Sequence, residues 1–147
     1  MSKEPYSMGL IKGNPFCGKK EILGDIVAIL DLIIEKRGMQ LIAPMSRAIL
    51  KHTICELALT DEETAGPGHF VNHVGYLGLF EVKTGGVAVV GDTIRIRKKL
   101  IGRLVGFDTT HAPNHLNLIV KSEEVITGAQ MKLQIGDPVT ITMTSEI

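Results

Sequence analysis

A short motif that occurs three times constrains the fold of this chain more than any other feature. The pattern Gly-Asp-x-β-branched-x-Ile begins at residues 24, 91 and 136, each time directly after an apolar residue. Glycine adopts the positive φ of a tight turn, aspartate hydrogen-bonds nearby backbone, and alternate apolar residues share one face of a strand. The motif therefore predicts three strands that begin with the same turn.

The same alternation predicts which side chains these three strands bury. The residues expected in the core are the two alternating apolar residues of each motif, Val27, Ile29, Ile94, Ile96, Val139 and Ile141. Arg95 and Arg97 lie between or after such residues, and we expect them to face outward.

Residues 26–35 fit a helix and a strand equally well. Read as a helix, positions 26, 29, 30, 33 and 34 form an apolar stripe; read as a strand, the even positions from 26 to 34 form an equally complete apolar face. We predict a strand, because half of these ten residues are Ile or Val and the other two motif copies lead into clear alternation. A helix at this place would change the fold class to α+β.

Several further alternating runs, separated by turns rich in glycine, predict a barrel. The remaining predicted strands are residues 39–43, 53–59, 70–82, 87–90, 93–97, 101–107, 116–121, 131–135 and 139–143. Ser46 to Lys51 is predicted as the one short helix, with Ser46 as its cap. Many short strands favour an all-β, mainly antiparallel barrel that is closed or nearly closed, because closure removes exposed edges. Residues 21–147 are expected to form this single domain after an irregular arm at residues 1–20.

Composition disfavours several classes of function. The chain has 147 residues, of which 44% are hydrophobic and 22% charged, as expected for one globular domain. Sixteen basic and sixteen acidic residues cancel, which disfavours nucleic acid as a partner. The longest apolar run, Ile26 to Ile34, is interrupted by Asp31 and is far shorter than the roughly 18 residues of a spanning helix, so no membrane is expected either. Cys17 and Cys55 have no CxxC spacing and are expected to be thiols of a cytoplasmic protein.

Four of the five histidines lie in two copies of the spacing His-x-x-Asn-His, which are His69 with His73 and His111 with His115. Residues i and i+4 of an extended strand are about 13 Å apart, so two such histidines share one metal ion only where a turn brings them together. Pro113 favours such a turn in the second copy. We therefore expect a metal site in which His111 and His115 converge, with His73 or His69 as the third ligand.

The chemistry of this site is left open between several alternatives. Neutral imidazoles would suit a divalent metal such as zinc, iron, nickel or manganese. Asp108 is the candidate catalytic residue, because it could orient a ligating imidazole or activate a water. A small-molecule ligand bound without metal is the first alternative. Ordinary turn or interface histidines are the second, since this spacing is no recognised zinc signature.

A basic stretch precedes the second histidine copy. It contains Arg95, Arg97, Lys98, Lys99 and Arg103 within nine residues, as a phosphate-binding strip would. Barrels that bind single-stranded nucleic acid pair such charges with stacking aromatic residues, but aromatic residues make up only 4% of this chain and none lies in the stretch. We therefore interpret the stretch as a solvated strand face.

A non-catalytic function is the second hypothesis for the whole protein. Residues 39–42 and 77–80 supply apolar side chains that one small core does not easily absorb, and such a surplus favours association. Homo-oligomers are the common result. The chain could thus be an oligomeric accessory or partner-binding subunit.

Several stretches of this sequence resemble a known group of proteins. The stretches are Ala65-Gly66-Pro67-Gly68, Tyr76-Leu77-Gly78, Thr84-Gly85-Gly86, Gly91-Asp92 and, above all, Gly106-Phe107-Asp108-Thr109-Thr110-His111-Ala112-Pro113-Asn114-His115. Together they are similar to a family of small uncharacterised bacterial proteins, and the similarity covers most of the chain after the arm. This resemblance implies a β-rich bacterial domain and no particular activity.

Overall fold

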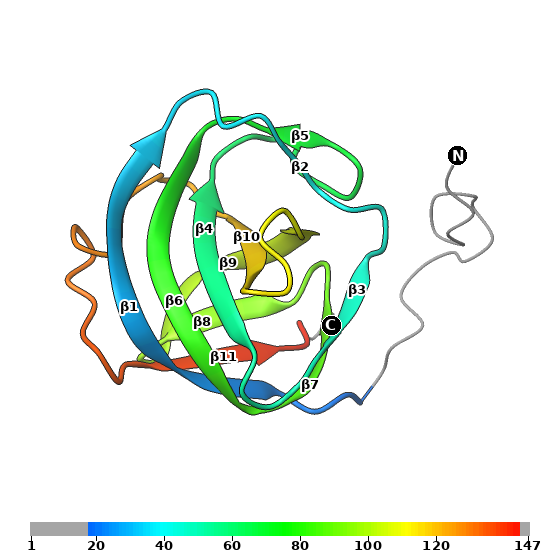
Figure 1. Ribbon diagram of the computed structural model, residues 1–147, viewed down its shortest axis with the longest axis vertical. Helices are drawn as coiled ribbons and strands as arrows, with labels where there is room; N and C mark the ends of the chain where they lie inside the picture. Colours follow the sequence, from blue (N-terminus) through cyan, green and yellow to red (C-terminus); the bar gives the residue numbers. More distant parts are fainter. Residues whose placement is uncertain (1–17, 145–147) are drawn as a thin grey trace.

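The computed structural model describes residues 18–144, which form eleven β-strands and no helix. In chain order they are β1 (Ile22–Ile34), β2 (Met39–Gln40), β3 (Ser46–Ile49), β4 (Ile54–Thr60), β5 (Phe70–Val71), β6 (Val74–Thr84), β7 (Gly86–Val89), β8 (Thr93–Ile96), β9 (Lys99–Asp108), β10 (Leu116–Lys121) and β11 (Pro138–Thr142). Seven of them close into a barrel in the order β1-β11-β8-β9-β10-β4-β6 (Figure 1). The predicted all-β barrel is confirmed, and residues 26–34 belong to a strand. The predicted arm, residues 1–20, lies outside the described residues except for its last three.

One seam of the barrel differs from the others. All neighbouring barrel strands pair antiparallel except β4 and β10, which run parallel. Two short pairs, β2 with β5 and β3 with β7, lie beside the barrel as separate two-stranded sheets (Figure 1). The two strands of the parallel pair are therefore separated in sequence by β5 to β9.

The barrel wall separates two hydrophobic clusters. Leu57 and Leu59 of β4 point into the barrel, where Phe80 and Phe107 are the largest fully buried side chains. Ala58, between the two leucines, belongs to a smaller cluster that also contains residues of β2, β5, β6 and β10. Since successive residues of a strand point to opposite faces, this second cluster lies on the outer side of the wall. The segment that carries β2 thus covers part of the outer wall.

Two of the three Gly-Asp motifs form the predicted turn. The glycines have φ values of 100° and 91°, and each aspartate exchanges two hydrogen bonds with the residue three positions earlier. Asp92 donates its N–H to the Val89 carbonyl over 2.9 Å, and its carboxylate accepts the Val89 N–H over 2.9 Å. Asp137 and Gln134 make the same two bonds over 3.0 and 2.8 Å. The strands after these turns bury the predicted residues, Ile94, Ile96, Val139 and Ile141.

The first Gly-Asp copy is different, and the prediction for its side chains was wrong. Val27 and Ile29 are 43% and 36% exposed, whereas Ile26 is buried. Gly24 lies inside β1 on the inner face, where a Cβ would come within 2.6 Å of the Phe80 ring. Because the glycine occupies a strand position rather than a turn, Ile26 points inward and Val27 outward. Register shifts with β6 after Ile26 and Ile29 then break the alternation, and Leu30 and Ile34 pack against the outer cluster. Of the two arginines, Arg97 is exposed as expected and Arg95 is half-buried on the outer face.

Two other predicted elements were wrong. Residues 46–49 form β3 instead of a helix. Antiparallel pairing with β7 gives their backbone N–H and C=O groups hydrogen-bond partners, whereas a single helical turn is too short to be stable. Residues 131–135 form turns instead of a strand, since Lys132 has a φ of 61° and Leu133 donates its N–H to the Gly128 carbonyl. Among residues 18–144, no helix is long and apolar enough to cross a membrane.

Candidate functional site

Three polar side chains form one row across neighbouring strands on the outer wall. Asn117 of β10 is in register with Asp108 at the end of β9 on one side and with Glu56 of β4 on the other. Asn117 and Asp108 are buried, and Glu56 is half-buried. We call these three residues the polar row. It lies across the parallel seam of the barrel.

Asp108 holds one end of the polar row in place. Its carboxylate accepts a hydrogen bond from Asn117 Nδ2 over 2.7 Å and another from the Thr110 hydroxyl over 2.6 Å. A buried carboxylate is tolerated when donors satisfy it in this way. The amide of Asn117 is thereby oriented, with its Oδ1 turned away from Asp108.

His115 covers the other part of the polar row from the loop before β10. Its Nε2 lies 3.7 Å from Glu56 Oε2, and its Nδ1 lies 3.0 Å from Asn114 Nδ2. With the Asn114 amide as donor, Nδ1 accepts and Nε2 carries the hydrogen of the neutral ring. Within residues 18–144, His115 Nε2 and Asn117 Oδ1 are the two buried side-chain polar atoms without a hydrogen-bond partner. Both belong to this site.

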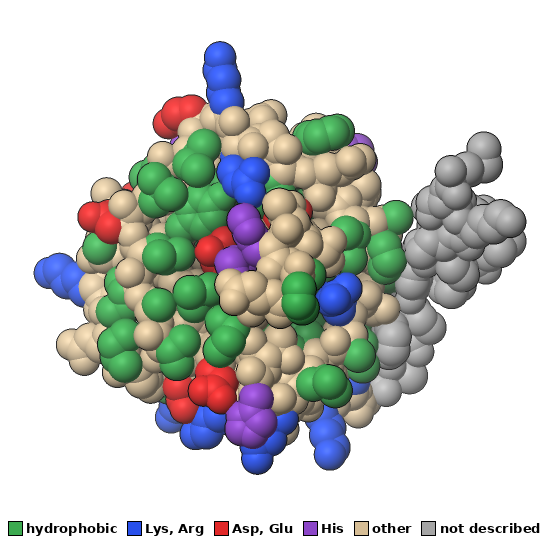
Figure 2. All heavy atoms as spheres, in the orientation of Figure 1, with side chains coloured by type: hydrophobic (Ala, Val, Ile, Leu, Met, Phe, Trp, Pro, Cys, Tyr) green, Lys and Arg blue, Asp and Glu red, His purple; other side chains and the backbone are tan. Residues whose placement is uncertain are grey.

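Charged side chains gather around the same place. Figure 2 shows histidine, acidic and basic side chains together near the middle of the face over β4 and β10, surrounded by hydrophobic ones. Arg37 donates from Nε to the Tyr76 hydroxyl over 2.9 Å, and Tyr76 belongs to the outer cluster beside the row. The site therefore combines a carboxyl, an imidazole, a phenol and a guanidinium on an apolar wall.

Burial shifts the ionisation of these groups. It raises the pKa of Glu56, a shift that His111 and Arg37 oppose and Asp108 reinforces. It lowers the pKa of His115, and the neighbouring His111 lowers that pKa further, against Asp108 and Asn117. It also raises the pKa of Tyr76. A carboxyl and an imidazole whose pKa values move toward each other are suited to sharing a proton.

The two His-x-x-Asn-His copies are not gathered into one metal site. His111 and His115 lie together, with ring centroids 4.9 Å apart and ring planes 25° apart. The nitrogen lone pair of an imidazole lies in the plane of its ring, so the lone pairs of two stacked rings do not point at a common position. For His111 and His115 to bind one metal ion, one ring must therefore turn. Among residues 18–144, no three His, Cys, Asp or Glu side chains are placed to hold a metal ion.

The first copy has its own, different surroundings. His73 lies 3.0 Å from Asp61 through Nδ1 and 3.6 Å from Glu35 through Nε2. The hydrogen bond with Asp61 raises the pKa of His73, and the charge of Glu35 reinforces the shift. His69 is exposed and contributes its backbone, because its carbonyl accepts the Leu41 N–H over 2.9 Å.

Cys55 takes no part in the site. It neighbours Glu56 in β4 but points into the barrel, where it is a buried free thiol. Burial raises its pKa to about 12, although Arg47 opposes the shift. The thiol therefore stays protonated at neutral pH and is a core side chain, as the alternation of β4 predicts.

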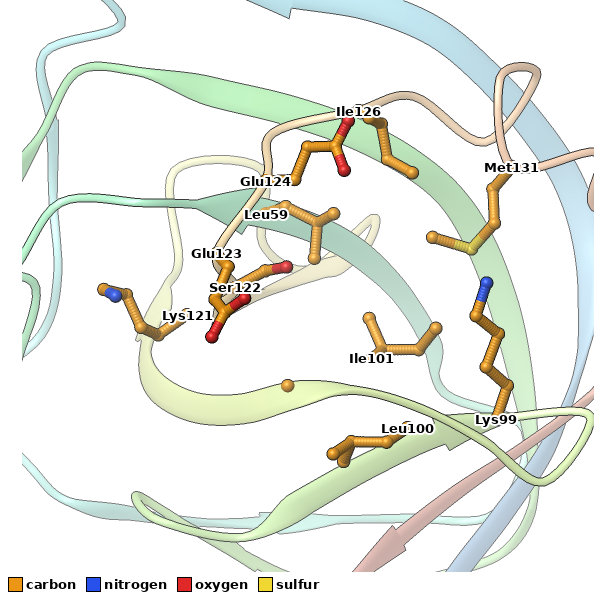
Figure 3. Close-up of a pocket in the computed structure, with 11 residues that line it drawn as sticks. Leu59, Lys99, Leu100, Ile101, Lys121, Ser122, Glu123, Glu124, Ile126 and Met131 are labelled. Carbon is orange, nitrogen blue, oxygen red and sulfur yellow. The ribbon is translucent and has the colours of Figure 1, made fainter.

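Two cavities are relevant to binding. A small one of about 270 Å³ lies between β3 and the loop before β10, and Arg47, Thr53, Pro113 and His115 are among the residues that line it. A larger one of about 550 Å³ opens at the barrel end; its apolar side chains are Leu59, Leu100, Ile101, Ile126 and Met131, with Lys99, Lys121, Glu123 and Glu124 around them (Figure 3). Sequence reasoning identified His115 and missed the larger cavity.

Sequence reasoning also missed most of the polar row. Of its three members only Asp108 was a candidate, together with His115 above it. Glu56 and Asn117 each interrupt an otherwise apolar strand, in Cys55-Glu56-Leu57 and Leu116-Asn117-Leu118. A single polar residue within a buried strand is the signal that could have identified them.

Comparison with known proteins places the chain in a family. No curated protein and no solved structure matches it. A family model described as a family of unknown function matches residues 16–142, a range that contains all eleven strands and every residue of the site. The chain belongs to this family, DUF6917.

Proposed function

We propose that this protein binds a small polar ligand at the polar row, and that Glu56 and His115 exchange a proton with it. The observation that supports this most is that His115 Nε2 and Asn117 Oδ1, a buried donor and a buried acceptor on neighbouring side chains, make no hydrogen bond of good geometry among the described residues. Buried polar atoms in folded proteins nearly always have a hydrogen-bond partner, so a ligand group is a natural partner for both.

The atoms available at the site define the ligand group. Neutral His115 offers an N–H from Nε2, and Asn117 Oδ1 offers an acceptor. A hydroxyl group accepts the first hydrogen bond and donates the second. Glu56, whose pKa is raised by burial, lies close enough to pass a proton to such a group or to take one from it.

Asp108 has an indirect function in this proposal. It accepts hydrogen bonds from Asn117 and Thr110 and not from His115. It is therefore a positioning residue that keeps Oδ1 of Asn117 aimed at the ligand. The pair of Arg37 and Tyr76 adds a positive charge and a hydroxyl beside the apolar wall, which favours a ligand with a second polar group.

A divalent metal is the alternative occupant. Zinc, iron, nickel or manganese could be held by His111 and His115 once one ring turns, with Glu56 as the nearest carboxylate. His69 and His73 are not needed in that arrangement. Metal analysis of protein purified without chelator distinguishes the two occupants.

A thermal-shift screen tests the proposal. The full chain is screened against small hydroxylated compounds and, separately, against zinc, iron, nickel and manganese salts. A compound that binds the site raises the Tm of wild type and of His73→Gln but not of His115→Gln, because only the second variant loses the Nε2 donor. Equal stabilisation of His115→Gln, or no response to any compound, would contradict ligand binding at the row. A metal-dependent response abolished by His111→Ala with His115→Ala would support the metal instead.

A second candidate function is that of a cytoplasmic homo-oligomeric accessory subunit. One observation favours assembly: Val27, Ile29, Leu32 and Ile33 of β1 are exposed together. Figure 2 shows hydrophobic side chains over the region that β1 occupies in Figure 1. Sedimentation of wild type should give a mass above the 15.9 kDa of the single chain, and Leu32→Lys should reduce it. Leu50→Lys, at an isolated exposed leucine, is the control; a 15.9 kDa species in wild type contradicts assembly.

A further inference from the structure

The basic stretch between residues 95 and 103 is divided by the fold into separate environments. Arg97 pairs with Asp137 over 3.3 Å, and Lys99 lines the cavity at the barrel end. Arg95 and Arg103 instead line a different hollow of about 480 Å³ on the outer face. The rest of its lining consists of Thr93, Leu100, Thr142, Met143 and Thr144.

The strand register explains why these side chains meet. Thr142 of β11, Thr93 of β8 and Arg103 of β9 are successive register partners and form one row across three strands. Arg95 lies two residues beyond Thr93 in β8, and therefore on the same face. Lys121 of β10 is the next register partner of Arg103. Because Lys121 pairs with Glu63 over 3.3 Å and lines the cavity at the barrel end, Arg95 and Arg103 are the two cations of this stretch that line the hollow.

Neither arginine of this hollow has an acidic partner among residues 18–144. The aspartates of this region have other partners: Asp92 is 2.6 Å from Lys19 in a buried pair, Asp137 pairs with Arg97, and Asp108 accepts hydrogen bonds from Asn117 and Thr110. Arg95 and Arg103 lie diagonally across β8 and β9, where two positive charges without a carboxylate partner among the described residues repel each other. The positive charge of the two arginines therefore favours the binding of an anion in the hollow.

Hydroxyl groups complete the hollow. Arg95 donates from Nη1 to the Thr142 hydroxyl over 3.3 Å, which holds the guanidinium against the wall. Thr144 donates its hydroxyl to the Gly91 carbonyl over 2.7 Å and lies 2.7 Å from the Thr93 hydroxyl. Arg103, by contrast, has no side-chain hydrogen-bond partner among residues 18–144 and keeps its donors available.

We propose that this hollow binds the phosphate group of a small phosphomonoester. Two guanidinium groups match the charge of about −1.5 to −2 that such a group carries at neutral pH, and each can donate two parallel hydrogen bonds to its oxygens. Leu100 and Met143 provide an apolar wall for the rest of the molecule. The lining contains no aromatic side chain on which a nucleic-acid base could stack, which favours a small phosphomonoester over nucleic acid.

This site is independent of the polar row. Asp108 of the polar row and Arg103 of the hollow lie five residues apart in β9, which corresponds to about 16 Å along the strand. The test of one site therefore does not decide the other. A ligand large enough to touch both is not required by either proposal.

Titration calorimetry on the full chain tests the proposal, with glycerol 3-phosphate and sulfate as probes at pH 7.5 and pH 5. Arg95→Gln and Arg103→Gln should each weaken glycerol 3-phosphate binding at least about tenfold, because each removes hydrogen bonds to a charged group. Lys98→Gln, which removes an exposed charge from the adjacent turn, should change binding less than about threefold. Lowering the pH should weaken glycerol 3-phosphate binding more than sulfate binding, since its second pKa is near about 6 and it loses charge whereas sulfate does not.

Several results would overturn the proposal. One is undiminished binding in Arg103→Gln that has the melting temperature of wild type. Another is equal weakening by Lys98→Gln, which would indicate attraction by the general field alone. Glu146 lies two residues after Thr144 in sequence, and its carboxylate would compete with an added anion for the arginines. Glu146→Gln is therefore measured alongside wild type. Absence of binding in both proteins would exclude the site.

Discussion

In the first His-x-x-Asn-His copy, His73 lies at the surface between Asp61 and Glu35, and the pKa of its ring is raised. In the second copy, His115 lies partly buried against Glu56 and is stacked on His111, and the pKa of its ring is lowered. The spacing in sequence is the same in both copies. The neighbours come from other strands, and they decide whether the imidazole favours its charged or its neutral form.

The two surroundings make only the second copy suited to proton transfer. His73 is a surface imidazole between two carboxylates, which favour its charged form, and neither of the buried unpartnered side-chain atoms of the described residues lies in this copy. His115 is neutral at physiological pH and presents an unpartnered N–H to a half-buried carboxyl. Four experiments test this contrast between the two copies.

The largest effect is expected from the carboxylates beside the two copies. Asp108→Ala should lower the free energy of unfolding by about 1 to 3 kcal/mol, because it leaves the buried Asn117 amide without its acceptor. Asp61→Ala should change it by less than about 1 kcal/mol, since an exposed ion pair contributes little. Urea unfolding at pH 7 measures both values. Equal losses would mean that the two copies are equally integrated into the fold.

The pH dependence of stability should have opposite signs at the two copies. The raised pKa of His73 contributes stability below about pH 6.5 that is lost as the pH rises through the folded-state pKa. The lowered pKa of His115 contributes stability above about pH 6.5 that is lost as the pH falls through the folded-state pKa. His73→Gln should therefore cost more at pH 5 than at pH 8, and His115→Gln the reverse. Urea unfolding at pH 5 and pH 8 measures the loss of unfolding free energy for each variant. A loss that changes in the same direction with pH in both variants would contradict the contrast.

A smaller effect is expected at Glu56. Its raised pKa means that the folded state disfavours the ionised carboxyl, so stability falls as the pH rises from about 4.5 through the folded-state pKa. Glu56→Gln removes this penalty and should gain stability relative to wild type as the pH increases. Glu81→Gln, at an exposed carboxyl paired with His52, is the matched control. A pH-independent difference for Glu56→Gln would show that the carboxyl is not penalised.

The smallest effect is expected at a histidine outside both copies. His52 lies in a turn with a φ of 75° and forms an exposed pair with Glu81. His52→Asn should change the free energy of unfolding by less than about 1 kcal/mol, because asparagine tolerates this backbone conformation and exposed pairs are weak. A larger loss in thermal or urea unfolding would remove it as a reference for the other variants.

Local pattern predicted the fold well because most strands alternate regularly and are bounded by turn residues. It was wrong where an interaction distant in sequence decided the outcome. Ser46 to Ile49 pair with β7, and no local helix propensity reveals that partner. Gly24 accommodates the Phe80 ring, which reversed the buried face of β1. In each case the partner lies more than thirty residues away.

The candidate site was predicted in part for the same reason. Asp108 and His115 belong to one short loop region, so their proximity could be expected. Glu56 joins them through the parallel pairing of β4 and β10, and no residue near Glu56 in sequence indicates that pairing. Metal binding by the four histidines and catalysis by Asp108 stay predictions.

The parallel seam also has a consequence for folding. Residues 61–115 lie between the two strands that it joins, so its formation carries the entropy cost of closing a long loop. Contacts of such high sequence separation form slowly, and Glu56 meets Asn117 only when they do. A partly folded chain would therefore have no complete site. A molecule bound across the seam would slow unfolding, because it would have to be released before β4 and β10 could separate.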